Sequence, residues 1–309
     1  MVYNNILEAI GGTPLVRLSR MVPEGSAEIL VKYEGLSVGG SIKTRTALAM
    51  LRAAEAEGEI GPESIIVEAT SGNQGIGLAL AGAVLGYRTV IILPDSVSEE
   101  RRLLIRQYGA ELRLIHDAGD IGRAIRECQE TAEAMAKENP HVFIPAQFEN
   151  PENPRVHELS TAREILDAVG GRIDAFCSGI GTGGTLTGIG RVLKRENPDI
   201  HIVAIEPEEA AVLSGGTVGT HIQMGIGDGI VPPILDVSII DEIAITTDSE
   251  ALDTARRLAR EEGLLTGISG GSNVAVALRL AARLGEGRRV VTVLPDTGER
   301  YFSTPLFDK

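Results

Sequence analysis

The segment 64–93, SIIVEATSGNQGIGLALAGAVLGYRTVIIL, decides the fold. Two short runs rich in Ile and Val, at 64–69 and 88–93, flank a longer Ala-, Leu- and Gly-rich stretch at 74–86. Continuous apolar strands on either side of a helix are typical of a parallel β-α-β unit, in which helices cover the sheet. This stretch therefore predicts an α/β protein.

The same alternation continues along the chain on both sides of about residue 150. Further strands are predicted at 111–115, 141–144, 173–178, 200–206, 242–246 and 289–295, with helices between them at 98–109, up to about 137, 153–170, 186–197, 249–263 and 271–285. Two α/β halves that meet near residue 150 explain this pattern. Ligands of such folds bind beyond the carboxyl ends of the strands, so the loops there are the candidate site.

Composition excludes several classes of function. The chain has 309 residues, a net charge of −14, no Trp and only 3% aromatic residues. The negative charge opposes binding to nucleic acid or to anionic membranes. No apolar run could span a bilayer and no signal peptide is evident, so we expect a cytoplasmic protein. The five histidines lack metal-ligand spacing, and Cys128 and Cys177 are expected to be buried free thiols.

Two loops that follow predicted strands suit anions. In EATSGNQG (68–75), Thr70, Ser71 and Asn73 precede a helix, whose N-terminal amides favour a carboxylate or phosphate. An ordinary helix cap by Ser71 or Asn73 is the alternative. The second loop is SGIGTGGTLTG (178–188). Its glycines and the hydroxyls of Thr182 and Thr185 could wrap around one phosphate group.

The second loop also fits a dinucleotide-binding pattern. Gly179, Gly181 and Gly184 satisfy G-x-G-x-x-G, and Glu206 follows at the distance expected for a ribose-binding acid. A nicotinamide-dependent oxidoreductase is therefore an alternative function.

A lysine loop, GGSIKTR (39–45), opens a helix that should be largely buried. Desolvation and the helix dipole would both lower the pKa of Lys43, and a neutral amine is the form that attacks a carbonyl group. In a later loop, Ser269 and Ser272 precede another helix, where capping is the alternative to a site role.

Taken together, these loops resemble the cysteine synthase (O-acetylserine sulfhydrylase) family of pyridoxal-phosphate enzymes. The matching stretches run in family order from about residue 10 to 307: IGGTPLVRL, SIKTR, EATSGNQGIGLA, PENPRVHELSTAREI, GIGTGGTLTGIGRVLK, GIGDGIVP, GISGGSN and LPDTGERYFSTPLF. The resemblance implies two three-layer αβα domains in the tryptophan-synthase-β-like fold (fold type II). The smaller domain would cover residues 43–150, and the larger one residues 1–42 plus 151–309.

The resemblance also implies roles for individual residues. Lys43 would bind pyridoxal 5′-phosphate covalently and move the α-proton of the substrate, Asn73 would bind the 3′-oxygen of the ring, and Ser269 would face the ring nitrogen. The phosphate would lie in the loop of Gly181, Thr182, Gly183, Gly184 and Thr185. The amino-acid substrate would contact Thr70, Ser71, Gln74, Gln147 and Gly225. The implied reaction replaces a leaving group on Cβ of an amino acid with a nucleophile, typically sulfide, and the implied assembly is a homodimer.

Several positions depart from the family pattern. Ser37 and Val38 replace the usual Asn-Pro, and Thr44 replaces a frequent Asp after the lysine. Gln74 stands where Thr is usual, and Asp228 where a small residue is usual. Asp228 would repel anionic sulfide, accept a proton from a thiol or water, or pair with the ammonium of a second amino acid.

These substitutions lead to the hypothesis that the donor or the acceptor differs from the typical member. Cysteine as the donor, with release of hydrogen sulfide and formation of lanthionine or cystathionine, is the main alternative. A catalytically silent homologue that binds a partner is another, and His157 is a further candidate for a site role.

Overall fold

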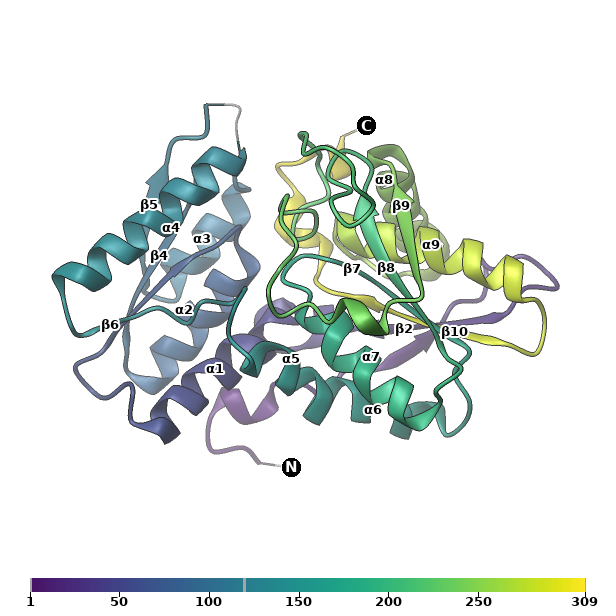
Figure 1. Ribbon diagram of the computed structural model, residues 1–309, viewed down its shortest axis with the longest axis horizontal. Helices are drawn as coiled ribbons and strands as arrows, with labels where there is room; N and C mark the ends of the chain where they lie inside the picture. The colour runs from purple at the N-terminus through teal and green to yellow at the C-terminus, as the bar shows by residue number, and fades with distance from the viewer. Residues whose placement is uncertain (1, 119–120, 309) are drawn as a thin grey trace.

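The computed structural model describes residues 2–118 and 121–308, which form two lobes side by side (Figure 1). The smaller lobe contains a parallel sheet in the order β5-β4-β3-β6. Its strands are β3 (Ile65–Ala69), β4 (Arg88–Pro94), β5 (Glu111–Ile115) and β6 (Val142–Phe143). Its helices are α1 (Lys43–Glu57), α2 (Asn73–Leu85), α3 (Glu99–Gln107) and α4 (Ile121–Glu138). Helices α2 and α3 cover one face, with α1 packed on α2, and α4 covers the other.

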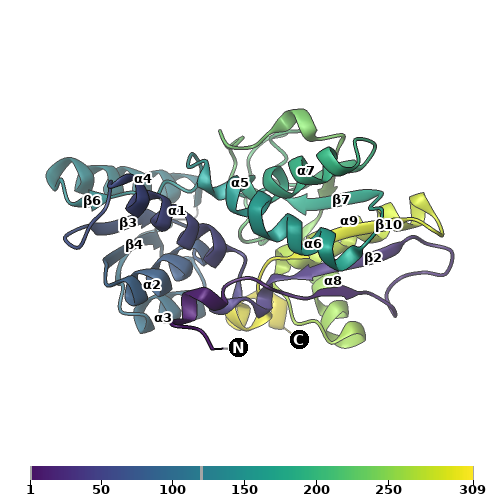
Figure 2. The same cartoon turned by 90° about the horizontal axis from the view of Figure 1, so that it is seen from below.

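The larger lobe contains a sheet in the order β1-β2-β10-β7-β8-β9. Its strands are β1 (Leu15–Arg17), β2 (Glu28–Tyr33), β7 (Ala175–Gly179), β8 (His201–Pro207), β9 (Glu242–Thr246) and β10 (Arg289–Leu294). Helices α5 (Glu152–Val156), α6 (Ala162–Val169) and α7 (Gly184–Glu196) lie on one side, and α8 (Asp248–Arg257) and α9 (Ile268–Leu284) on the other (Figure 2). Each sheet is thus enclosed by helices on both faces, and the predicted α/β class with αβα layers is confirmed. The exact domain boundaries stay a prediction.

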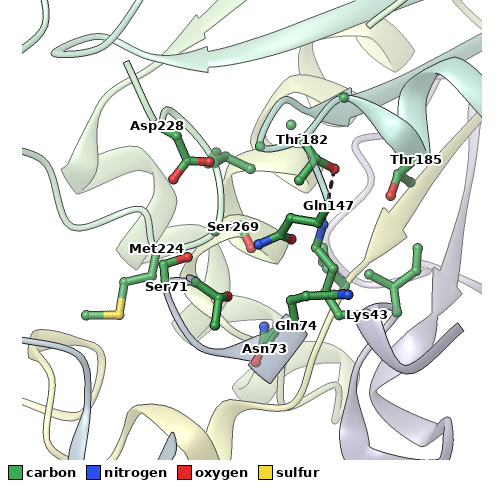
Figure 3. Close-up of a pocket in the computed structure, with 18 of the residues that line it drawn as sticks. Lys43, Ser71, Asn73, Gln74, Gln147, Thr182, Thr185, Met224, Asp228 and Ser269 are labelled. Atoms are coloured by element: carbon green, nitrogen blue, oxygen red, sulfur yellow. Dashed lines mark hydrogen bonds between the residues drawn. The ribbon is translucent and has the colours of Figure 1, made fainter. Parts of the chain in front are cut away.

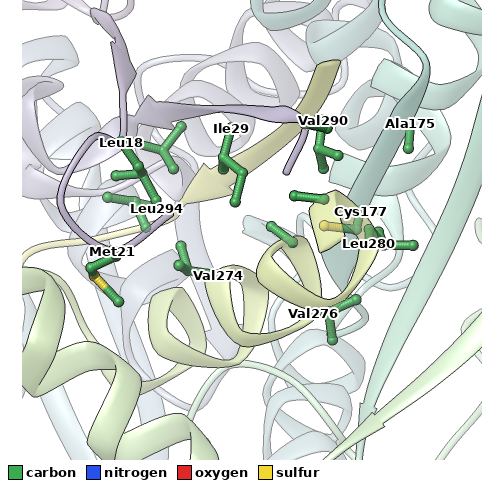
Figure 4. Close-up of a cluster of buried hydrophobic side chains, with 14 of the residues drawn as sticks. Leu18, Met21, Ile29, Ala175, Cys177, Val274, Val276, Leu280, Val290 and Leu294 are labelled. Atoms are coloured by element: carbon green, nitrogen blue, oxygen red, sulfur yellow. The ribbon is translucent and has the colours of Figure 1, made fainter. Parts of the chain in front are cut away.

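The central strand β10 explains why the larger lobe has two apolar layers. Val290 and Leu294 point into a core against α9 (Figure 4), whereas Val291 and Val293 join the core on the α7 side. Because side chains of a strand alternate between faces, a strand buried on both sides must be apolar at almost every position. This is the continuous pattern by which the strand was predicted.

The sequence pattern missed the hairpin of β1 and β2, which is the antiparallel part of the larger sheet. A lysine near the end of β2 interrupts its apolar run: Lys32 is 1% exposed and pairs with Glu164 at 2.7 Å. A buried charge needs a partner that is distant in sequence, so the pattern alone does not reveal such a strand.

Helix ends agree with the predicted ends to within a few residues, with three differences. The predicted helix at 153–170 consists of α5 and α6 joined by a π-helical segment at His157–Thr161. Helix α9 begins at Ile268, three residues before the predicted start, so the serines that were expected to precede the helix lie inside it. The predicted helix at 249–263 consists of α8 followed by a π-helical turn at Leu258–Glu262. Across residues 2–118 and 121–308, no helix combines the length and apolar character that crossing a bilayer requires.

Two leucines test the core of the larger lobe. Leu193 of α7 is 1% exposed, whereas Leu159 is 68% exposed. Leu193→Ala should lower the free energy of unfolding by about 2–5 kcal/mol because it leaves a cavity, and Leu159→Ala should change it by less than about 0.5 kcal/mol. Urea denaturation followed by circular dichroism measures both; equal losses in the two variants would contradict the assigned core.

Candidate active site

A pocket between the lobes collects nearly all of the predicted site residues (Figure 3). Its lining includes Lys43, Thr70, Ser71, Asn73, Gln74, Gln147, Gly181, Thr182, Gly183, Thr185, Gly225, Asp228 and Ser269. Gly184, the first residue of α7, does not line it. The pocket lies where the loops after β3, β6, β7 and β8 meet, which is the position expected for a ligand site in an α/β fold.

Lys43 is the first residue of α1, and its side chain extends into the pocket toward the larger lobe. The Nζ atom donates a hydrogen bond to Thr182 Oγ1 at 3.2 Å. Burial lowers the pKa of the Lys43 ammonium to about 8, although the carboxylates of Asp228 and Glu68 act in the opposite direction. The expected loss of basicity by desolvation is confirmed, and a substantial fraction of the amine is neutral near pH 8.

The glycine loop before α7 forms a cradle in which Gly181, Gly183 and Gly184 carry no side chain. Gly183 caps α7 with a φ of 80°, and a Cβ on Gly181 would lie 2.3 Å from the Gly225 carbonyl oxygen. The first amides of a helix have no partner within it, and here the hydroxyls of Thr182 and Thr185 add to them. A phosphate group fits this set of donors.

Glu206 does not serve this cradle. Its carboxylate accepts hydrogen bonds from the amides of Leu213 and Ser214, at 2.8 and 3.2 Å, and from the Ser214 hydroxyl at 3.0 Å. The acid is 3% exposed and committed to that loop. The dinucleotide alternative requires this carboxylate to bind a ribose hydroxyl, but protein donors already occupy it.

The asparagine loop presents Asn73 in a fixed orientation. Gly72 caps α2 with no side-chain hydrogen bond, so the alternative of a cap by Ser71 or Asn73 is wrong. Instead, Asn73 Nδ2 donates to Asp296 Oδ2 at 2.7 Å, and Arg300 Nη1 donates to Asn73 Oδ1 at 2.6 Å. The second hydrogen on Nδ2 remains to donate to a ligand oxygen in the pocket.

Sequence reasoning missed Asp296, Arg300 and the nearby Arg101. Arg101 is 1% exposed, its guanidinium lies 4.4 Å from the centre of the Tyr301 ring, and its Cδ would meet a Cβ on Gly72. In the sequence Arg101 belongs to SEERR, which resembles the charged face of a surface helix. Only the fold brings these charges together beneath the asparagine loop.

Gln74 and Gln147 face the pocket beside this loop. Gln74 is 1% exposed; Thr46 Oγ1 donates to its Oε1 at 2.8 Å, and its Nε2 has no hydrogen-bond partner in the part of the chain that the structure describes. The backbone amide of Gln147 donates to Glu68. Burial raises the pKa of Glu68 to about 7, against the effect of its two amide donors and of Lys43.

Asp228 lies on the opposite side of the pocket from Gln74 (Figure 3). Burial raises the pKa of its carboxyl group, while the ammonium of Lys43 acts to lower it. His221 holds the loop: Gln223 N donates to its Nδ1 at 3.2 Å, so its Nε2 carries the proton and donates to Gly227 O at 3.0 Å. The pocket therefore holds an acid and an amine whose ionisations influence each other.

Ser269 lies in the first turn of α9 and is 4% exposed, with its side chain at the pocket. Gly267 caps this helix without a side-chain hydrogen bond, so neither Ser269 nor Ser272 caps it. A hydroxyl at the pocket wall is compatible with a neutral ring nitrogen of a cofactor.

The remaining candidates lie outside the pocket. His157 is buried, its Nδ1 hydrogen-bonds Thr161 Oγ1 at 2.9 Å, and burial with nearby Arg45 and Lys43 holds its pKa well below the usual range. Cys128 and Cys177 are buried free thiols, as predicted, and burial raises the pKa of each to about 12. Within the described ranges, no group of His, Cys, Asp and Glu side chains could hold a metal ion.

Comparisons with known proteins agree with this geometry. Residues 6–296 match the family model described as pyridoxal-phosphate dependent enzyme. A cysteine synthase from Staphylococcus aureus (strain Mu50) is 50% identical over 305 residues, which is 98% of this chain and 97% of the relative. The crystal structure of an O-ureido-L-serine synthase superposes with a TM-score of 0.95 at 46% identity, over 100% of this chain and 96% of that one. A hydrogen sulfide-producing enzyme from Fusobacterium nucleatum gives 0.92 at 38% identity, over 97% and 100%.

The lowered pKa of Lys43 predicts how the protein takes up the cofactor. Cofactor-free protein mixed with pyridoxal 5′-phosphate should develop the visible absorbance of the covalently bound cofactor faster as pH rises, with a midpoint near the Lys43 pKa of about 8, because only the neutral amine attacks. Lys43→Ala should show no such band, and Lys137→Ala, on the exposed side of α4, should behave as the wild type. A midpoint near the pKa of a free lysine would contradict the effect of burial.

Proposed function

We propose that this chain, which belongs to the pyridoxal-phosphate dependent enzymes, converts O-acetyl-L-serine and sulfide into L-cysteine and acetate. It is a cysteine-synthase-like enzyme of the β-replacement type with pyridoxal 5′-phosphate as its cofactor. The observation that carries the proposal is the partly neutral amine of Lys43, placed between the glycine loop and Asn73 in one pocket.

The residues of the pocket fit the cofactor. The glycine loop, with Thr182 and Thr185, would hold its phosphate, Asn73 would donate to its 3′-oxygen, and Ser269 would face its ring nitrogen. When bound, the cofactor supplies an electron sink that weakens the Cα–H bond and allows a leaving group to depart from Cβ. Lys43 would hold it covalently until the amino group of the substrate takes its place.

The chain itself would bind the donor amino acid and move its proton. Thr70 and Ser71 stand at the start of α2, where the helix dipole favours the donor carboxylate, and Gln147 would complete that contact. Once released, the Lys43 amine would accept the proton from Cα, since its pKa of about 8 suits both uptake and return of a proton near neutral pH.

Asp228 favours a second candidate, in which cysteine is the donor and hydrogen sulfide is released. A thiol acceptor such as a second cysteine or homocysteine must lose a proton as it attacks Cβ, and a carboxylate at the pocket could accept that proton. Burial raises the pKa of Asp228, which makes it a stronger base than an exposed aspartate. Sulfide at neutral pH is largely anionic and needs no such base.

The two candidates predict opposite effects of Asp228→Asn. With thiol acceptors, the variant should lose on the order of a hundredfold in kcat, because it lacks the base. With sulfide as the acceptor, KM for sulfide should fall, because a repelling charge is removed. Steady-state assays with O-acetylserine or cysteine as donor measure both.

Asp253→Asn, in which a 73% exposed carboxylate changes, is the control for Asp228→Asn. Unchanged parameters of Asp228→Asn with every donor and acceptor would refute a role for this residue. A wild type that converts neither donor would refute the proposed function itself and favour a silent homologue.

We further infer a cytoplasmic homodimer. The free thiols of Cys128 and Cys177 suit a reducing compartment. The apolar side chains of Val2, Tyr3 and Ile6 are exposed by 96%, 48% and 50%, which supports a surface for a second copy of the chain. Sedimentation equilibrium of the holoenzyme would give the mass of a dimer; the mass of a monomer would refute the assembly.

A further inference from the structure

We propose that Glu68, which does not line the pocket, is a positioning residue for the donor amino acid because it holds the loop at 145–148 that carries Gln147. The inference rests on the proposed function, in which Gln147 binds the donor carboxylate. Glu68 is the penultimate residue of β3 and does not line the pocket, so its action on the substrate would pass through this loop.

Both oxygens of Glu68 are bound to consecutive backbone amides of the loop. Ala146 N donates to Oε2 at 3.0 Å, and Gln147 N donates to Oε1 at 3.1 Å. The carboxylate is 2% exposed, so these amides replace the water that it has lost. The loop joins β6 to α5, where the chain passes from the smaller lobe to the larger one.

The backbone at this point is strained and needs such a hold. Ala146 has a φ of 54°, and it is the only non-glycine residue with a positive φ in the described parts of the chain. The left-handed region disfavours an alanine because of its Cβ, and strained residues persist only where the surroundings fix them. The amide contacts of Glu68 fall on this residue and on the next one.

The carbonyl of Gln147 is held from the other side. Asn153 Nδ2 lies 2.8 Å from Gln147 O and 2.9 Å from Thr182 Oγ1, and that same hydroxyl accepts from Lys43. The peptide groups on either side of Gln147 are thus fixed by Glu68 at the amide and by Asn153 at the carbonyl. This double contact directs the Gln147 side chain into the pocket. Through Asn153, it also fixes the position of Gln147 relative to the glycine loop.

Only a carboxylate satisfies both amides. Glutamine at position 68 would keep one acceptor oxygen but turn an NH₂ group toward the second N–H, so two donors would face each other. The loop would have to move to relieve that contact, and Gln147 would move with it. The cofactor contacts lie on other loops and would remain.

The test is Glu68→Gln in the holoenzyme. We expect KM for the donor to rise about tenfold, which corresponds to the loss of one buried hydrogen bond to a charged group, with cofactor content within about twofold of the wild type. Because the Glu68 carboxylate also raises the pKa of Lys43, the pH profile of kcat should shift to lower pH, and kcat at its optimum should stay within about twofold of the wild type. Hydrogen exchange of the amides of Ala146 and Gln147 should accelerate in the same variant. An unchanged KM together with unchanged exchange would overturn the proposal.

A second substitution separates positioning from general damage. In the double variant Glu68→Gln/Ala146→Gly, glycine adopts the positive φ without strain, so the loop should keep its shape without the carboxylate and KM should return toward the wild-type value. A double variant no better than Glu68→Gln would overturn the proposal.

Glu206→Gln is the matched control. Glu206 is also buried near the end of a strand and accepts from two consecutive amides, but their residues, Leu213 and Ser214, do not line the pocket. This variant should leave the donor KM unchanged; an equal rise would overturn a specific role for Glu68. Because hydrogen exchange needs no turnover, failure of the proposed function would appear as inactive wild-type enzyme and remain distinct from failure of this inference.

Discussion

The burial of the Lys43 amine at the N-terminal end of α1 is the constraint on which the site depends. Loss of water and the positive end of the helix both disfavour the ammonium form. Two carboxylates, Asp228 and Glu68, act in the other direction and prevent a larger shift. The resulting pKa of about 8 leaves the amine able both to attack and to carry a proton near neutral pH. A more exposed lysine would remain charged, and a more isolated one would not return the proton.

Such an amine is useful only if the helix that carries it cannot slide. Arg45, one half-turn after Lys43, pairs with Glu34 at 2.8 Å and with Glu164 at 2.6 Å, and Lys32 also pairs with Glu164. Breaking a buried pair would leave an uncompensated charge, so this network tolerates little displacement. It joins α1 to β2 and α6 of the larger lobe. The charges of this network are thus paired with one another, whereas the Lys43 amine donates to the hydroxyl of Thr182.

The sequence predicts the parts of this design that depend on local pattern. Apolar runs identify the layers, because buried strands and helices repeat apolar residues with their own periods. Glycine-rich loops place the pocket at the strand ends, because glycines mark loops directly in the sequence. Contacts between distant charges leave no such trace. Arg300 and Asp296 fix Asn73, and Lys32 sits inside a strand, yet each looks like an ordinary charged residue until the chain is folded. The same holds for Glu68, which in the sequence only interrupts an apolar strand.

Reactivity and substrate choice are not independent in this pocket. The cofactor is expected to rest largely on backbone groups, which the fold provides, but the acceptor would meet single side chains. Asp228 raises the pKa of Lys43, and Lys43 lowers that of Asp228. A carboxylate that serves an acceptor by taking its proton would lose its charge in doing so, and Lys43 would then become a weaker base at the moment when a proton must return to Cα. In the proposed reaction, Asp228 would therefore couple arrival of the acceptor to proton delivery by Lys43, so that exchanging this one residue would change two steps.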